Sequence, residues 1–173
     1  MARNLIKNPC GEEGLKYWED IEAGGDGWKV VDLPGAIFPL HLVKKYFASS
    51  YGWCSKSQLI DLLQEGYTRE MLDNNQPCIV ISEWYGSRHD CGCRYELTVQ
   101  LLSDCREVIA EYKSGTITIP ETLDNYWRQI GHTFSRYGPG VRYIRFKHGG
   151  QDSKFWKGWY GAQVTKSSVT INV

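Results

Sequence analysis

The sequence lacks an excess of either charge, and it lacks a long hydrophobic run. Its 173 residues carry 20 Lys or Arg and 20 Asp or Glu, so the formal net charge is zero. A chain without a basic excess has no electrostatic attraction for a nucleic-acid backbone or for anionic lipid. No segment approaches the roughly 18 consecutive apolar residues that a membrane-spanning helix needs. These absences argue against nucleic-acid partners and membrane insertion.

Further absences concern the compartment and the cysteines. The polar start, residues 1–9, lacks the apolar segment of a secretory signal, and no Asn-x-Ser/Thr glycosylation acceptor is present. Cys91 and Cys93 form the only close pair of cysteines, without the second pair that a structural zinc site usually has. The six cysteines could form three disulfides, but without a secretory signal we expect reduced thiols. We therefore expect a cytoplasmic protein with no metal and no cofactor.

The sequence also lacks a recognisable catalytic set. It contains no Gly-x-Ser-x-Gly, no His-Glu-x-x-His and no phosphate-binding loop. His89 and Cys91 lie two residues apart and would share one face of an extended strand. Asp90 would then point to the other face, where it could not orient the imidazole for nucleophilic catalysis. We therefore expect that the protein is not an enzyme.

Strand-like alternation dominates the chain. Between residues 95 and 101 every second side chain is apolar and the intervening ones are polar. Glycine, proline and asparagine interrupt such runs at regular intervals. The segment 57–63 fits either a helix or a buried strand, and its neighbours favour a strand. Thr68 can cap one or two helical turns over residues 68–73. Many short strands without a βαβ rhythm predict an all-β fold, an antiparallel β-sandwich of two sheets.

The most informative segment, residues 148–161, places four aromatic rings in six positions between glycines. Rings so close together on a strand or loop cannot all point into one core. A loop that presents Phe155, Trp156 and Lys157 offers flat apolar faces edged with hydrogen-bond donors, which suits a sugar ring. The alternative is that these are core aromatics, which we favour for Trp159 and Tyr160.

Three residues outside this loop region are expected to be structural. We expect Trp28 and Trp53 in the core, and His148 as a hydrogen-bonding residue of the structure.

The aromatic segment belongs to an ordered set of motifs that resembles the F-box-associated domain of the sugar-recognising F-box proteins. The resemblance runs from Arg3 to Val173, and we expect one domain over residues 3–173. It implies a jelly-roll sandwich similar to galactose-binding domains, with the ligand loops at one end. The other motifs are Asn8-Pro9-Cys10-Gly11-Glu12-Glu13, Gly24-Gly25-Asp26-Gly27-Trp28, Lys44-Lys45-Tyr46-Phe47, Ser50-Tyr51-Gly52-Trp53-Cys54, Tyr137-Gly138-Pro139-Gly140-Val141-Arg142 and Gly161-Ala162-Gln163-Val164-Thr165.

The resemblance implies a lectin-like domain that recognises substrates for an SCF-type ubiquitin ligase. Its ligand would be the inner chitobiose of high-mannose N-glycans on misfolded glycoproteins, in quality control linked to endoplasmic-reticulum-associated degradation. The helical F-box that binds the SCF adaptor would normally precede Arg3. Either the chain is a domain of a longer ligase subunit, or it resembles the non-specific cytotoxic cell receptor proteins. These relatives lack an F-box, and the chain would then act as a protein-interaction or lectin module without ligase activity.

The resemblance places the glycan contacts on Tyr51, Asp90, Phe155, Trp156 and Lys157. Trp156 would supply the stacking face and Lys157 a mobile donor. Each has an alternative: Tyr51 can pack under the loop, Asp90 can bond its own backbone in a turn, and Lys157 can be an ordinary solvated lysine. Sugar-binding members commonly carry Tyr-Trp-Lys here, so this chain lacks one hydroxyl at Phe155. Losing a hydroxyl that bonds the sugar costs about 1 kcal/mol.

Overall fold

The computed structural model describes residues 3–33, 40, 42–88, 91–121 and 127–173. These residues form eleven strands and one short helical segment of π type, η1. No helix within the described ranges is long and apolar enough to span a membrane. The elements are β1 (Glu19–Ala23), β2 (Lys29–Asp32), β3 (Lys45–Ala48), β4 (Cys54–Asp61), η1 (Met71–Asn75), β5 (Cys78–Gly86), β6 (Cys93–Leu102), β7 (Val108–Lys113), β8 (Ile117–Ile119), β9 (Arg128–Phe134), β10 (Tyr143–Asp152) and β11 (Gln163–Asn172).

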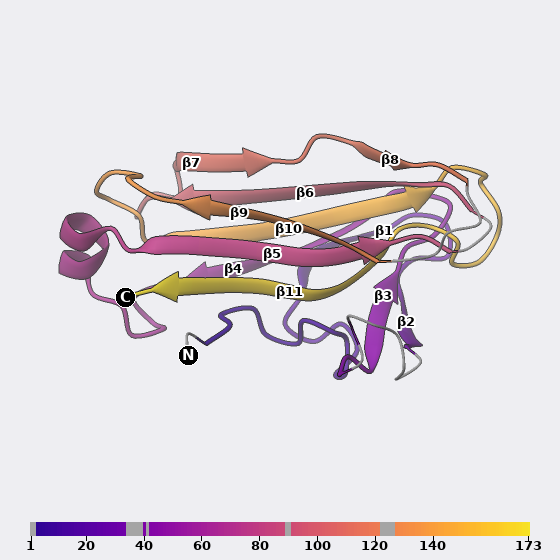
Figure 1. The fold of residues 1–173 in the computed structure, drawn as a ribbon, viewed down its shortest axis with the longest axis horizontal. Helices are drawn as coiled ribbons and strands as arrows, with labels where there is room; N and C mark the ends of the chain where they lie inside the picture. Colours follow the sequence, from indigo (N-terminus) through magenta and orange to yellow (C-terminus); the bar gives the residue numbers. More distant parts are fainter. Residues whose placement is uncertain (1–2, 34–39, 41, 89–90, 122–126) are drawn as a thin grey trace.

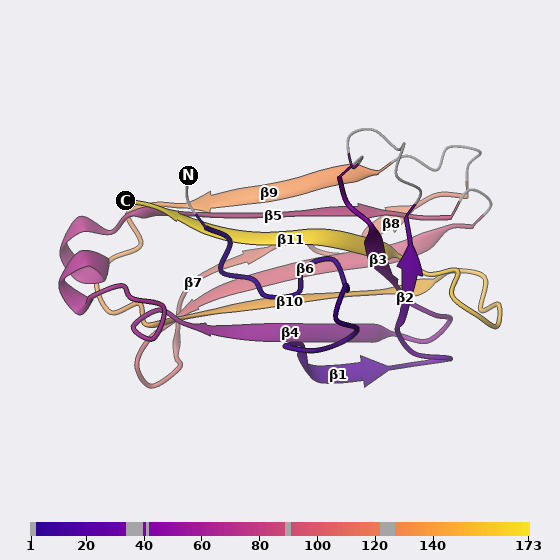
Figure 2. The same ribbon diagram turned by 90° about the horizontal axis from the view of Figure 1, so that it is seen from below.

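The strands form two antiparallel sheets, which confirms the predicted sandwich. One sheet has the order β1-β4-β10-β6-β7, with β8 paired to β6. The other has the order β2-β3-β11-β5-β9. Figure 1 shows the long strands running along the molecule, with η1 and both termini toward one end and the β10–β11 loop at the other. Figure 2 shows the short strands β2 and β3 crossing this long direction near the loop end.

The core lies between the two sheets and follows the alternation of the sequence. In β6 the apolar side of the predicted strand faces inward, and Tyr95, Leu97, Val99 and Leu101 each have no exposed surface. The residues between them, Glu96, Thr98 and Gln100, are only half-buried. The segment 57–63 is largely strand, as expected, because β4 extends to Asp61. Burial of one complete face of the strands β4, β5, β6, β10 and β11 supplies the main stabilisation of the sandwich.

The predicted cap at Thr68 is present. Its Oγ1 accepts the backbone N–H of Met71 at 3.1 Å, and a helical turn begins there before η1. The helical segment is therefore as short as the sequence indicates.

A lysine, a histidine and a glutamate lie together inside the sandwich, among the apolar residues. Lys56 on β4, His148 on β10 and Glu83 on β5 are all buried. Lys56 Nζ is 2.7 Å from His148 Nε2, and the other ring nitrogen of His148 bonds Glu83. Ser167 donates a further bond of 2.7 Å to the Glu83 carboxylate. His148 is thus the structural hydrogen-bonding residue that the sequence predicts.

Candidate functional site

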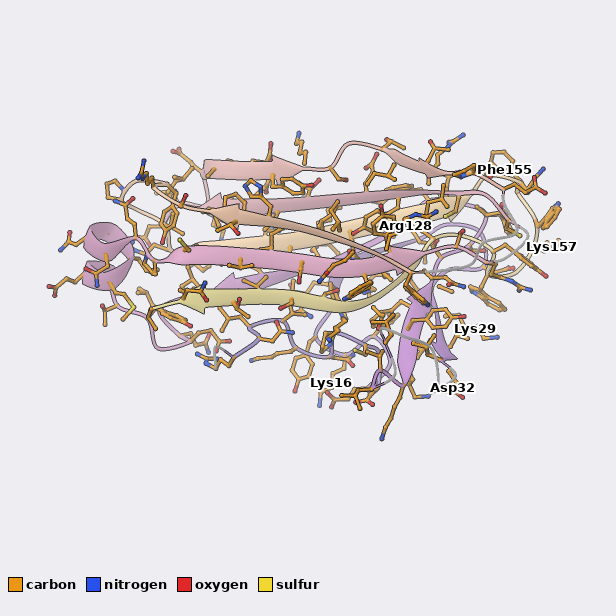
Figure 3. The ribbon with its side chains drawn as sticks, in the orientation of Figure 1. Lys16, Lys29, Asp32, Arg128, Phe155 and Lys157 are labelled. Atoms are coloured by element: carbon orange, nitrogen blue, oxygen red, sulfur yellow. The ribbon has the colours of Figure 1, made fainter. Side chains whose placement is uncertain are left out.

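The loop between β10 and β11 extends from the end of the sandwich opposite η1. Phe155 is 65% exposed and Trp156 is 44% exposed. Lys157 is exposed and has no ion-pair partner among the described residues. Figure 3 shows Phe155 and Lys157 projecting beyond the strand ends at this pole of the molecule. The loop therefore carries its apolar rings and its cation at the surface, as the sequence predicts.

A buried carboxylate fixes the backbone of this loop. Asp152 is the last residue of β10 and has no exposed surface. Its Oδ2 accepts the backbone N–H of Trp156 at 3.0 Å, and its Oδ1 accepts that of Lys154. Between these bonds Phe155 has a φ of 57°, in the left-handed region that L-residues rarely occupy. The two bonds hold this conformation, and they fix the position of the Trp156 backbone relative to the end of β10.

Ser50 connects the aromatic loop to two other chain segments. Its hydroxyl donates to the carbonyl of Gly158 at 2.5 Å, and its carbonyl accepts the N–H of Asp152 at 2.8 Å. Asp26 accepts the N–H of Gly158 at 2.7 Å, and its own N–H donates to the Ser50 hydroxyl at 2.9 Å. Tyr51 directly follows Ser50 and is half-buried. The structure therefore brings the segment that carries Tyr51 against the segment that carries Trp156.

The remaining rings of the loop are supported by cations. Trp156 makes an edge contact with Tyr160, with ring centroids 5.6 Å apart. The Arg88 guanidinium lies 4.2 Å above the Tyr160 ring, and Lys29 Nζ lies 4.5 Å above the Trp159 ring. Both Trp159 and Tyr160 are half-buried, and neither belongs to the hydrophobic core that we expected them to join. These two rings connect the loop to Lys29 and Arg88 of neighbouring segments.

Asp90 lies outside the described residues. The described residues on either side of it do contact the aromatic loop. Arg88 lies over Tyr160, and the carbonyl of Gly92 accepts the N–H of Ser153 at 3.1 Å. The chain thus approaches the loop both before and after the Asp90 segment.

Comparison with known sequences identifies the family. Residues 1–171 match the family described as the F-box associated region. The chain belongs to this family. It is 57% identical over 174 residues to F-box only protein 2 of Bos taurus, 50% over 175 to F-box only protein 6 of Rattus norvegicus, and 49% over 174 to F-box only protein 44 of Homo sapiens. The alignments cover 98%, 99% and 99% of this chain, but only 59%, 62% and 68% of those proteins.

Solved structures with the same fold include carbohydrate-binding modules. TmCBM61, solved in complex with beta-1,4-galactotriose, superposes with a TM-score of 0.63 at 14% identity, over 99% of this chain and all of that one. The CBM22-1 xylan-binding domain of Paenibacillus barcinonensis Xyn10C gives 0.53 at 12% identity, over 98% of this chain and 95% of that one. At such low identity the likeness establishes the shared β-sandwich of this F-box-associated chain and nothing further.

The structure adds site residues that sequence reasoning missed, namely Asp152, Ser50 and Asp26. An Asp-Ser pair at the end of a strand is a common start of a turn bonded by the aspartate, and this signal could have indicated Asp152. Ser50 and Asp26 act across the fold, and no local pattern marks them. Among the described residues, no group of three or more His, Cys, Asp or Glu could hold a metal ion.

The two tryptophans expected in the core differ. Trp28 is half-buried and packs against the core as expected. Trp53 is also half-buried, but it lies beside a hollow of the six-stranded sheet, so its expected place in the core is wrong. Trp53 is two residues before Ser55, so the two side chains lie on the same face of the extended chain. Both line the hollow, and the Trp53 ring is therefore on the outer side of the sheet.

Proposed function

We propose that the loop end of this F-box-associated domain binds saccharide, with the inner chitobiose of high-mannose N-glycans on misfolded glycoproteins as the ligand. Trp156 supplies the stacking face, and Tyr51, Asp90, Phe155 and Lys157 are the other proposed glycan contacts. The observation that carries the proposal is the exposure of Trp156, 44%, on a backbone held by the buried Asp152. A soluble domain gains no folding energy from an indole in water, so an exposed ring on a rigid loop is suited to a ligand.

The rigidity of the loop supports this proposal energetically. Binding costs free energy for ordering loops and side chains, and a loop that is already fixed avoids most of this cost. The bonds of Asp152 and Ser50 place the backbone before any ligand arrives. We expect the site to be shallow, so that a single glycan covers little area. We expect a Kd in the micromolar to millimolar range, which is about −8 to −4 kcal/mol.

Phe155 in place of the family's tyrosine should reduce the free energy of glycan binding only slightly. The side chain is 65% exposed, so the position where a hydroxyl would sit is open to solvent rather than enclosed. The loss is then limited to one hydrogen bond, about 1 kcal/mol.

A domain that binds the inner chitobiose would act in glycoprotein quality control. These two sugars lie against the polypeptide of a folded glycoprotein and become accessible when it unfolds. In our proposal the domain selects misfolded glycoproteins in the cytoplasm and presents them to an SCF-type ligase, without itself catalysing a reaction. The matched relatives are F-box only proteins, which favours this role over that of an F-box-less interaction module.

A glycan array tests the proposal most broadly. The purified domain is applied to chitobiose, to high-mannose glycans that contain it and to mannose oligomers that lack it. We expect binding only where chitobiose is present. Binding to no glycan, together with capture of an SCF adaptor or another protein from a pull-down, would replace the lectin by a protein-binding module.

A further inference from the structure

The hollow beside Trp53 lies on the outer face of the six-stranded sheet, and none of the residues that line it belongs to the aromatic loop. Its volume is about 350 Å³. Trp53 bounds it at the end nearer the loops, and its floor is the outward side of β10 and β6. On that floor Gly149 pairs with Glu96, Lys147 with Thr98, and Arg145 with Gln100.

Gly149 allows the indole of Trp53 to lie on the sheet. A Cβ at Gly149 would come within 2.6 Å of Trp53 Cζ2 and 2.8 Å of the Cys54 carbonyl, closer than atoms can approach. Only glycine therefore leaves room for the ring, which rests against the strand and lines the hollow. A flat aromatic ring at the end of a polar groove is a platform on which the apolar face of a sugar ring can stack.

The carboxylates of this groove already have partners. Glu96 accepts the hydroxyl of Thr116 at 2.5 Å. Glu111 accepts the Gln100 amide at 2.6 Å and lies 3.5 Å from the Lys113 ammonium. Glu111 therefore has a cation beside it, whereas Glu96 has a hydrogen-bond donor but no ion pair among the described residues.

Two cations of the groove are not compensated. Arg145 is half-buried and Lys147 is exposed, and neither has an ion pair or side-chain hydrogen bond among the described residues. They are two residues apart on β10, so they share a face about 7 Å from one another along the strand. Long flexible side chains at this spacing can converge on a single anionic group.

We propose that this groove binds an acidic saccharide, one whose sugar ring carries a carboxylate. The ring stacks on Trp53, its hydroxyls donate to Glu96 and Thr98, and its carboxylate pairs with Lys147 and Arg145. A neutral sugar would leave both cations unpaired. An acidic peptide would bring its carboxylates against Glu96 and Glu111, whereas sugar hydroxyls can donate to these acids. The groove does not depend on the loop site, although Tyr51 and Trp53 are only two residues apart.

Amide chemical shifts in NMR titrations test the proposal with two matched ligand pairs. One pair is sialyllactose and lactose, and the other is α-1,4-linked trigalacturonate and maltotriose. We expect saturable shifts of the amides around Thr98, Lys147 and Gly149 with at least one acidic ligand and none with its neutral counterpart. The same binding should weaken as salt is raised.

Charge-neutral variants identify the binding residues. In the double variant Arg145→Gln, Lys147→Gln the acidic ligand should bind at least ~10-fold more weakly, because two charge-assisted hydrogen bonds are lost. Lys44→Gln removes an exposed cation outside the groove and should bind as the wild type does. Chitobiose shifts at the aromatic loop should be the same in all three proteins, so that failure of one site is distinguishable from failure of the other. Equal binding of acidic and neutral ligands, groove amides that do not respond, or equal weakening by Lys44→Gln would each overturn the proposal.

Discussion

Lys56 Nζ lies 2.7 Å from His148 Nε2 in the middle of the sandwich, and neither side chain reaches solvent. The ammonium also lies 3.3 Å from the ring centroid of Trp18 and 3.6 Å from that of Phe47. We assign the ammonium as donor to Nε2, so that Nδ1–H donates to Glu83. The imidazole then bridges the Lys56 ammonium and the Glu83 carboxylate while remaining neutral. Burial lowers the pKa of Lys56 well below 10.5, whereas Glu83 and the aromatic faces favour its charged form.

Replacing Lys56 by methionine should raise the pKa of His148. Burial and the neighbouring ammonium lower this pKa, while Glu83 raises it. Without the ammonium, the attraction of Glu83 is less opposed, and the imidazole takes up a proton more readily. Removing one partner of a buried ionic group should also destabilise the fold by about 3–5 kcal/mol. The imidazole C–H shifts in NMR report the pKa, and His132, which is exposed, is the internal reference. An unchanged or lower pKa of His148 would contradict the assigned bridge.

The same network predicts how stability depends on pH. The pKa of His148 is lowered in the folded state, chiefly by burial, from the ordinary value of 6.5. The unfolded chain therefore binds the proton first, and the free energy of unfolding should decrease as pH falls below about 6.5. Urea unfolding at a series of pH values measures this slope. His148→Gln should reduce this slope, and an unchanged slope in the folded variant would contradict the role of His148.

Asp73 and Arg142 form an ion pair at the end of the sandwich remote from the aromatic loop, and this pair also predicts a pH-dependent stability. The two Arg142 nitrogens lie 2.8 and 2.9 Å from the Asp73 carboxylate, which also accepts the N–H of Gly140. These bonds lower the pKa of Asp73 from 3.8 to about 2. The stabilisation is thus present above pH 4 and is lost as pH falls toward 2.

Asp73→Asn should consequently cost about 1–2 kcal/mol at pH 7 and much less near pH 2. The comparison is Asp32→Asn, since the Asp32 side chain is 85% exposed in its pair with Lys45 and should contribute under ~0.5 kcal/mol. Urea unfolding at both pH values measures the loss of unfolding free energy. A loss in Asp73→Asn that is the same at pH 7 and pH 2 would show that the carboxylate charge does not contribute.

Asp152→Ala should weaken glycan binding although its carboxylate is buried and cannot reach the ligand. The substitution removes the acceptor for the N–H groups of Lys154 and Trp156, so the loop no longer has one fixed backbone. We expect roughly a 10-fold loss of chitobiose affinity, since the ligand must now order the loop. Asp152→Asn keeps one carbonyl acceptor and should fall between the wild type and alanine. Circular dichroism confirms that the variants are folded, and wild-type affinity in folded Asp152→Ala would refute this positioning role.

The parts of this structure that could be predicted from sequence are the local ones. Apolar side chains alternate from Tyr95 to Leu101 because successive side chains of one strand point to opposite faces. The buried face can therefore be predicted without knowing which strands lie beside it. Thr68 acts on an N–H three residues away. The exposure of Trp156 follows from the glycines and polar residues around it.

The parts that could not be predicted depend on contacts between distant segments. Glu83 and His148 are 65 positions apart, and Lys56 and His148 are 92 apart, so nothing local shows that they meet. Lys56 in particular would be expected at the surface of a strand. Trp53 was expected in the core because large aromatics are usually buried, but the pleat places it on the outer face, where Gly149 of another strand makes room.

The affinity of Trp156→Ala for chitobiose tests the central claim most directly. Isothermal titration of a chitobiose-containing high-mannose glycan compares this variant with the wild type and with Tyr17→Ala, which removes an aromatic ring that is 45% exposed outside the loop cluster. We predict that Trp156→Ala loses about 2 kcal/mol or more of binding free energy, while Tyr17→Ala binds as the wild type does. Equal affinity of all three proteins would contradict the account, because the indole would then not contact the sugar.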